Sequence, residues 1–147
     1  MPRSALRLSN AFAILLFASA ALSQARDFRS LRVTPEEFHW IARGTNIQRA
    51  DLVGQENRPG PYVYRLRFAR GYKASPHTHP DDRVVTVISG TFYVGFTERF
   101  DESEVKRMPP GSTWTEPVRQ AHYGWAKDGD VEIQVVGYGP SGTNRTL

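Results

Sequence analysis

Short β-type runs separated by glycine and proline dominate the chain from Ile47 onward, and they constrain its fold more than any other feature. In the segment 62–68, the side chains of Tyr62, Tyr64, Leu66 and Phe68 share one face, as in a half-buried strand. Turn-forming residues separate the runs. Regularly spaced short strands predict an all-β barrel or sandwich. The expected strands are Gln48–Val53, Tyr62–Phe68, Arg83–Ser89, Thr91–Thr97, Ser112–Glu116, Ala121–Ala126 and Val131–Tyr138.

A short N-terminal helix is expected before these strands. In the segment Thr34–Glu37, the threonine suits the N-cap, the proline suits the first helical position, and two glutamates complement the helix dipole. The helix would continue through Ile41 and stop near Gly44. His39 has no second ligand at helical spacing, so we interpret it as a surface or packing residue. The polar segment 98–108 predicts a surface excursion, with one helical turn as an option.

The first 25 residues are organised as a secretory signal peptide. Arg3 and Arg7 precede the apolar run 11–22, and Ser23-Gln24-Ala25 offers a small-x-small cleavage site. Cleavage after the serine is nearly as plausible as cleavage after the alanine. The apolar run is short for a membrane span, which disfavours the alternative of an uncleaved anchor. We expect a secreted or periplasmic protein, free of the membrane after cleavage, in which residues 26–147 form a single domain.

Charge and cysteine content exclude several classes of protein. Loss of Arg3 and Arg7 would lower the formal net charge from +4 to +2, because no acidic residue leaves with them. Basic and acidic residues are interspersed, without a cluster that would follow a phosphate backbone, so nucleic-acid binding is not expected. The chain has no cysteine, so its stability rests on a hydrophobic core, and any metal site must use imidazole and carboxylate ligands.

Three of the four histidines form the strongest candidate site. His77 and His79 are two residues apart, so in an extended segment both imidazoles leave the same face and can bind one ion. His122, from a distant strand, would supply a third imidazole. Three imidazole nitrogens suit zinc and also copper, iron or nickel. Packing explains such a set poorly, because burying a polar ring without a hydrogen-bond partner costs about 2 kcal/mol or more.

The spacing of these residues resembles the two motifs of the cupin superfamily. The resemblance covers roughly residues 48–137 and implies a cupin β-barrel, that is, a double-stranded β-helix or jelly roll. It places His77, His79 and His122 on the histidine ligand positions. The structural glycine and proline positions of the motifs correspond to Gly71, Gly90, Gly111 and Pro117.

Two residues depart from the cupin pattern. Arg83 occupies the position of the usual glutamate ligand, and arginine cannot bind a metal because it has no free lone pair. Arg119 replaces the inner glycine of the second motif. Glu116 is the candidate substitute ligand, or a general base beside the ion, or else a solvated strand end. Asp82 is a weaker candidate, because strand alternation points it away from its neighbour.

Arg83 itself has two interpretations. An inward-facing guanidinium would add to the charge of the ion, so that the pocket would favour an anion such as a carboxylate, enolate or phosphate. An outward-facing Arg83 would pair with Asp81 or Asp82 in a surface salt bridge worth less than about 1 kcal/mol.

These features lead to a divalent metal ion as cofactor: zinc, iron, manganese or nickel. The favoured function is a metal-dependent enzyme of the oxygenase, isomerase, lyase or hydrolase type, with Glu116 and Arg83 as candidate catalytic residues and a small oxygenated or anionic substrate. The alternative is a non-catalytic metal-binding or sensing module, and a third option is an empty barrel that binds an apolar or sugar ligand. The resemblance further implies a homodimer formed by sheet packing.

Overall fold

The computed structural model describes residues 30–145, so the predicted signal peptide lies outside the described residues. After one 3₁₀ turn (η1, Pro35–Glu37), the described chain consists of strands and loops. The strands are β1 (Ile41–Gly44), β2 (Ile47–Val53), β3 (Gly60–Phe68), β4 (Lys73–Thr78), β5 (Arg83–Ser89), β6 (Phe92–Gly95), β7 (Lys106–Met108), β8 (Thr113–Glu116), β9 (His122–Trp125), β10 (Val131–Gly139) and β11 (Asn144–Arg145).

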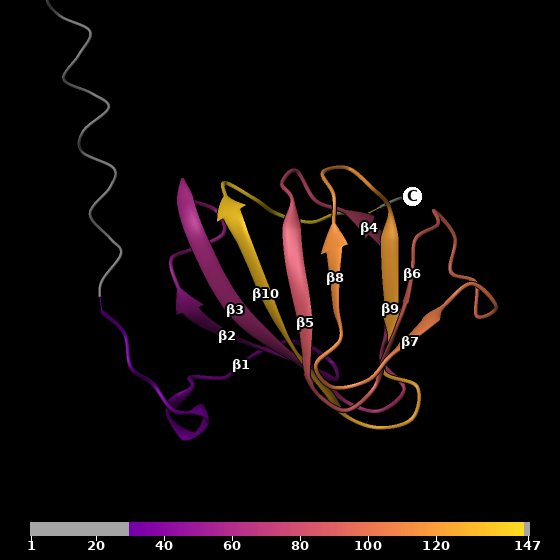
Figure 1. The fold of residues 1–147 in the computed structure, drawn as a ribbon, viewed down its shortest axis with the longest axis horizontal. Coiled ribbons are helices and arrows are strands. Elements are labelled where there is room, and N and C mark those ends of the chain that lie inside the picture. Colours follow the sequence, from indigo (N-terminus) through magenta and orange to yellow (C-terminus); the bar gives the residue numbers. More distant parts are fainter. Residues whose placement is uncertain (1–29, 146–147) are drawn as a thin grey trace, which may run out of the picture.

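The strands form two antiparallel sheets that are the halves of a jelly-roll barrel (Figure 1). One sheet has the order β1-β2-β3-β10-β5-β8, and the other has the order β11-β4-β9-β6-β7. The neighbours are distant in sequence: β10 pairs with both β3 and β5, and β9 pairs with both β4 and β6. The all-β prediction is confirmed.

The inward side chains of both sheets make one hydrophobic core. The predicted alternation of β3 holds, since Tyr62, Tyr64 and Phe68 are buried and Leu66 is partly buried against the core. Phe68 stacks on Phe92 across the two sheets, with ring centroids 5.1 Å apart. This contact places aromatic side chains from both sheets in the interior of the barrel.

The predicted N-terminal helix is wrong beyond its first turn. The backbone N–H of Thr34 donates to the Glu37 carboxylate at 2.6 Å, as a capping box would, but the turn ends at Glu37. The continuation, Ile41–Gly44, is strand β1 and pairs with β2. A free sheet edge therefore overrides the local helix signal at this point. His39 is exposed, as expected of a residue outside the site.

The glycines and the arginine at the motif positions explain the turns of the barrel. Gly90 has φ +74°, and a Cβ there would lie 2.1 Å from the carbonyl oxygen of Asp130, so no other residue fits without rearrangement. Arg119 also has positive φ, +61°, at the position where cupins carry glycine. Its backbone N–H donates to the carbonyl oxygen of His79 at 2.8 Å, which ties this turn to the candidate site.

Candidate metal centre

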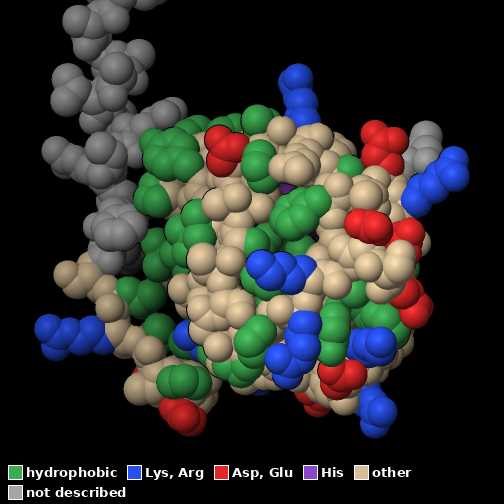
Figure 2. Space-filling model, turned by 45° about the vertical axis from the view of Figure 1, so that its right-hand side comes forward, with side chains coloured by type: hydrophobic (Ala, Val, Ile, Leu, Met, Phe, Trp, Pro, Cys, Tyr) green, Lys and Arg blue, Asp and Glu red, His purple; other side chains and the backbone are tan. Residues whose placement is uncertain are grey.

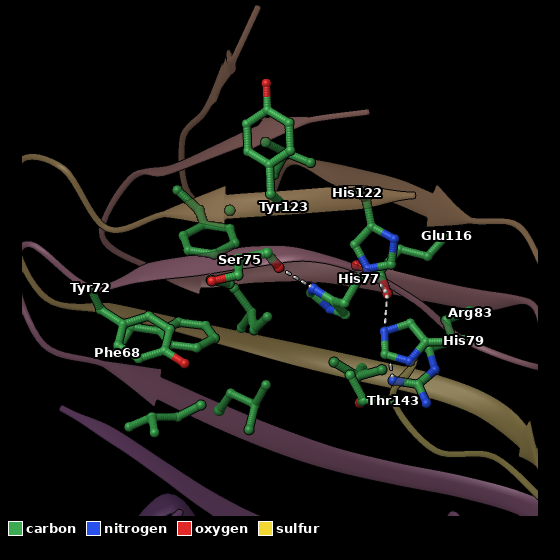
Figure 3. Close-up of a pocket in the computed structure, with 18 of the residues that line it drawn as sticks. Phe68, Tyr72, Ser75, His77, His79, Arg83, Glu116, His122, Tyr123 and Thr143 are labelled. Carbon is green, nitrogen blue, oxygen red and sulfur yellow. Dashed lines mark hydrogen bonds and ion pairs between the residues drawn. The ribbon is translucent and has the colours of Figure 1, made fainter. Parts of the chain in front are cut away.

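The three predicted histidines meet at one end of the barrel, where β4 and β8 end and β5 and β9 begin (Figure 3). His77 lies on β4 opposite His122 on β9, and His79 follows directly after β4. One ring nitrogen of each histidine lies within 4.8 Å of the others. His79 and His122 are each 3% exposed, and only slivers of histidine reach the face in Figure 2.

Backbone carbonyls hold all three rings in the same tautomer. The Nδ1 of His77 lies 2.7 Å from the carbonyl oxygen of Ser75. The Nδ1 of His79 lies 2.7 Å from that of Gly142. The Nδ1 of His122 lies 3.1 Å from that of Gln120. A carbonyl oxygen only accepts, so each Nδ1 carries the proton and each Nε2 carries an unprotonated lone pair.

Glu116 ends strand β8 and faces the same point. Its Oε2 lies 3.3 Å from the Nε2 of His122 and 3.7 Å from the Nε2 of His79. Its Oε1 accepts a hydrogen bond from the Trp114 indole at 3.1 Å. The side chain is 8% exposed, so Glu116 is not a solvated strand end. Glu116 pairs in register with Arg83 on β5, so the carboxylate stands one strand away from the usual glutamate position.

The donor atoms fit a divalent cation. Among the described residues, His122 Nε2 is a buried side-chain nitrogen without a hydrogen-bond partner. With the proton on Nδ1, its lone pair faces the carboxylate of Glu116, and two electron-pair donors at this distance repel unless a cation lies between them. Three imidazole nitrogens and one carboxylate oxygen are ligands for zinc, iron, manganese or nickel.

Protonation states at neutral pH suit metal binding. Burial lowers the pKa of His79 to about 4, and the charge of Arg83 acts in the same direction. Burial also lowers the pKa of His77. Burial raises the pKa of Glu116, but the neighbouring His122 and His79 outweigh it and hold that pKa below its ordinary value. His77 and His79 are therefore neutral and Glu116 is ionised, which are the forms that bind metals.

Arg83 faces inward and is also paired with Asp81, so the structure combines parts of both interpretations. The guanidinium has five N–H groups. Its Nε donates to Asp81 at 3.1 Å, and its Nη1 lies 2.9 Å from the Tyr64 hydroxyl and 3.3 Å from His79 Nε2. Its Nη2 donates to the Ser141 hydroxyl and the Gly142 carbonyl. Within residues 30–145, all five N–H groups thus face acceptors of the protein.

The Arg83 cluster fastens the segment 141–145, which we call the C-terminal strap, over the site. Asp81 accepts hydrogen bonds from Tyr62 and Ser141, so the ion pair is part of a network. The strap in turn supplies the Gly142 carbonyl that holds His79, and its β11 pairs with β4 beside His77. Sequence reasoning missed the strap, because backbone carbonyl groups and a two-residue strand leave no pattern in a sequence.

A cavity of about 300 Å³ extends from the histidines into the barrel. Figure 3 shows Phe68 and Tyr72 at one end and the histidines, Glu116 and Arg83 at the other. Tyr123 lines the cavity, but its hydroxyl donates to the backbone of Asp101.

Two residues close to the site in sequence have other contacts. Trp125 packs against Lys73 and does not line the cavity. Asp82 accepts the backbone N–H of Val118 at 2.8 Å and does not belong to the histidine group.

An antiparallel jelly roll with three inward histidines at one end defines the cupin class of barrel. A search against family models finds no match. Among solved structures, the chain is similar to an RmlC-like cupin from Shewanella frigidimarina, with a TM-score of 0.62 and 17% identity over 76% of this chain and 93% of that one. It is also similar to the polyketide cyclase RemF from Streptomyces resistomycificus, with a TM-score of 0.67 and 13% identity over 81% and 87% of the two chains.

A sequence relative gives the same result. The chain is 27% identical over 106 residues to germin-like protein subfamily 1 member 7 of Arabidopsis thaliana, a match that covers 68% of this chain. The chain spans about half the length of this relative, 46%. The chain thus has the cupin fold, and the resemblance to the cupin superfamily drawn from its motifs is confirmed. No helix among residues 30–145 is long and apolar enough to cross a membrane.

Proposed function

We propose that this protein is a metal-dependent enzyme that acts on a small oxygenated substrate held in the barrel cavity. The observation that carries the proposal is the shared tautomer of His77, His79 and His122, whose unprotonated Nε2 atoms gather at one point of the barrel. A bound divalent ion would supply Lewis-acid chemistry to a substrate oxygen, or redox chemistry if it is iron. The polyketide cyclase among the structural neighbours is a cupin-fold enzyme, which supports an enzymatic role.

The residues of this chain would take distinct roles. The three histidines would hold the ion, and Glu116 would either complete the ligand set or accept a proton from the substrate. Arg83 would position His79 through the strap, because four of its five N–H groups face protein acceptors other than the histidine and its charge is balanced by Asp81. Attraction of an anionic substrate oxygen would then fall to the ion itself.

The alternative function is a metal-holding module without catalysis. The arrangement of Glu116 favours it in one respect: a fourth protein ligand closes a tetrahedral site, as in structural zinc centres. The cavity beside the histidines favours the enzyme, because a purely structural ion needs no adjacent space for a ligand.

Metal content of the purified protein, measured by elemental mass spectrometry, tests the proposal. We expect near-stoichiometric metal in the natural sequence and its loss in His77→Ala. His39→Ala is the matched control, because His39 is exposed and lies outside the site. Full metal content in His77→Ala would contradict the site, and the absence of metal in all three proteins would contradict the function.

Glu116→Gln separates the two roles of the carboxylate. If Glu116 is a ligand, the variant should bind metal about 10- to 100-fold more weakly, as the loss of a supporting group does in other metal sites. If Glu116 is a base, metal affinity should be retained.

We also propose that the protein is exported, on the strength of the signal-peptide pattern in residues 1–25. Intact-mass measurement of the protein from the periplasm or medium should give a chain that starts at Arg26 or Gln24. A full-length chain confined to the cytoplasm would contradict export.

A further inference from the structure

We infer that the ligand of the barrel has an oxygen head that reaches the metal centre and a largely apolar body about the size of one ring. The inference rests on the proposed function, since the head would bind the ion held by His77, His79 and His122. What it adds is the chemical class of the body, which follows from the part of the cavity that lies away from the histidines.

That part of the cavity is an apolar chamber. Its walls come from both sheets and are mostly apolar: they include Ile47, Leu66, Phe68, Phe92, Ile133 and Val135, with the ring of Tyr72 stacked on Phe68. Ile47 and Leu66 are only partly buried, so they present apolar surface that the core itself does not cover. Filling the chamber with an apolar group would remove that surface from water, whereas a polyhydroxylated group would lose its hydration without gaining equivalent partners there.

The cationic side chains that line the cavity are not available to pair with a polar or acidic body of the ligand. Arg83 is buried, but its charge is paired with Asp81 and four of its five N–H groups face protein acceptors other than His79. Lys73 pairs with Glu102 at 2.7 Å and lies over the Trp125 ring, away from the chamber. Arg145 is exposed at the end of the described chain. A carboxylate on the body of the ligand would therefore find no buried, unpaired cation among the described residues of the chamber.

The size of the cavity restricts the body further. About 300 Å³ is at the lower limit for ligand sites in proteins, and part of it lies at the histidines. One ring or a short branched chain fits this space together with a small head. Aromatic walls such as Phe68 and Phe92, already stacked on each other, also favour a flat body.

Three hydroxamates with the same metal-binding head and different bodies test the inference. Benzohydroxamate carries a ring, acetohydroxamate carries a methyl group, and gluconohydroxamate carries a polyhydroxylated chain. Their affinities would be measured by calorimetry on the protein loaded with the metal it naturally holds, or with zinc. Burial of a ring predicts that benzohydroxamate binds at least about 30-fold more tightly than each of the others. The inference would be overturned if benzohydroxamate bound no more than threefold more tightly than either of the other two hydroxamates.

A matched pair of variants locates the effect. Ile47→Thr puts a hydroxyl into the chamber wall, and should weaken benzohydroxamate about fivefold while leaving acetohydroxamate unchanged. Ile88→Thr makes the same change on the outside of β5, where the side chain is 37% exposed, and should change neither. Equal effects of the two variants would contradict the chamber.

The apolar chamber can be tested even if the proposed metal-dependent function is wrong. If the protein holds no metal, the hydroxamate comparison is replaced by titration of the metal-free protein with p-cresol, followed by NMR. Saturable shifts that Ile47→Thr weakens would support an apolar chamber in a barrel without an ion. The absence of p-cresol binding would overturn the inference as well.

Discussion

Replacing Arg83 should destabilise the protein far more than replacing an arginine of the surface. In Arg83→Met, Asp81 loses its partner at 3.1 Å, in an ion pair whose side chains are 2% and 8% exposed. Breaking a buried pair by removal of one charge costs about 3–5 kcal/mol, because the other charge stays buried. Methionine occupies a similar volume, so the change removes charge and hydrogen bonds rather than packing.

The matched control is Arg67→Met. Arg67 pairs with Glu132 at 2.9 Å, but its side chain is 43% exposed, and Arg65 remains as a second partner of that glutamate. Its loss should cost less than about 1 kcal/mol. Free energies of unfolding from urea titrations, followed by circular dichroism on metal-free protein, would compare the two variants without a contribution from bound ion.

Two results would refute the reasoning about Arg83. One is a loss of stability in Arg83→Met as small as that in Arg67→Met. The other is a double variant, Arg83→Met with Asp81→Leu, that is no more stable than Arg83→Met alone, since removal of both charges should recover part of the loss. Metal affinity of Arg83→Met should also fall, because the strap carries the Gly142 carbonyl that orients His79.

Three further predictions concern stability and assembly. The natural metal at 100 times its dissociation constant should stabilise the folded protein by about 2.7 kcal/mol and raise its melting temperature. A chelator should reverse this rise. An unchanged melting temperature would contradict metal binding to the folded state. Gly124→Ala should cost about 1–3 kcal/mol in urea unfolding, because a Cβ there would lie 2.3 Å from the Phe92 ring, whereas Gly129→Ala meets no atom within 4 Å and should be nearly neutral. The outer face of the six-stranded sheet exposes Val84 and Val136, which are 47% and 40% exposed, and we expect a homodimer by light scattering after size exclusion; a monomer at all concentrations would contradict it.

Much of the fold was predictable because strand periodicity and turn residues act locally. The expected run Arg83–Ser89 matches β5 residue for residue, and the expected Gln48–Val53 lies within β2. The errors fall where pairing partners are distant. Strand β1 formed from the expected helix, and the polar strands β7 and β11 gave no apolar alternation to detect.

The sequence by itself indicated the three histidines of the candidate site. The two-residue spacing of His77 and His79 sets both imidazoles on one face of an extended segment, whatever the rest of the chain does. Only the tertiary structure decided what surrounds them. Register between β5 and β8 brought Glu116 beside Arg83, and the strap brought the Gly142 carbonyl to His79 across 63 residues. Such contacts depend on the long-range pairing of strands, and a backbone carbonyl is identical in every residue, so no local pattern could indicate them.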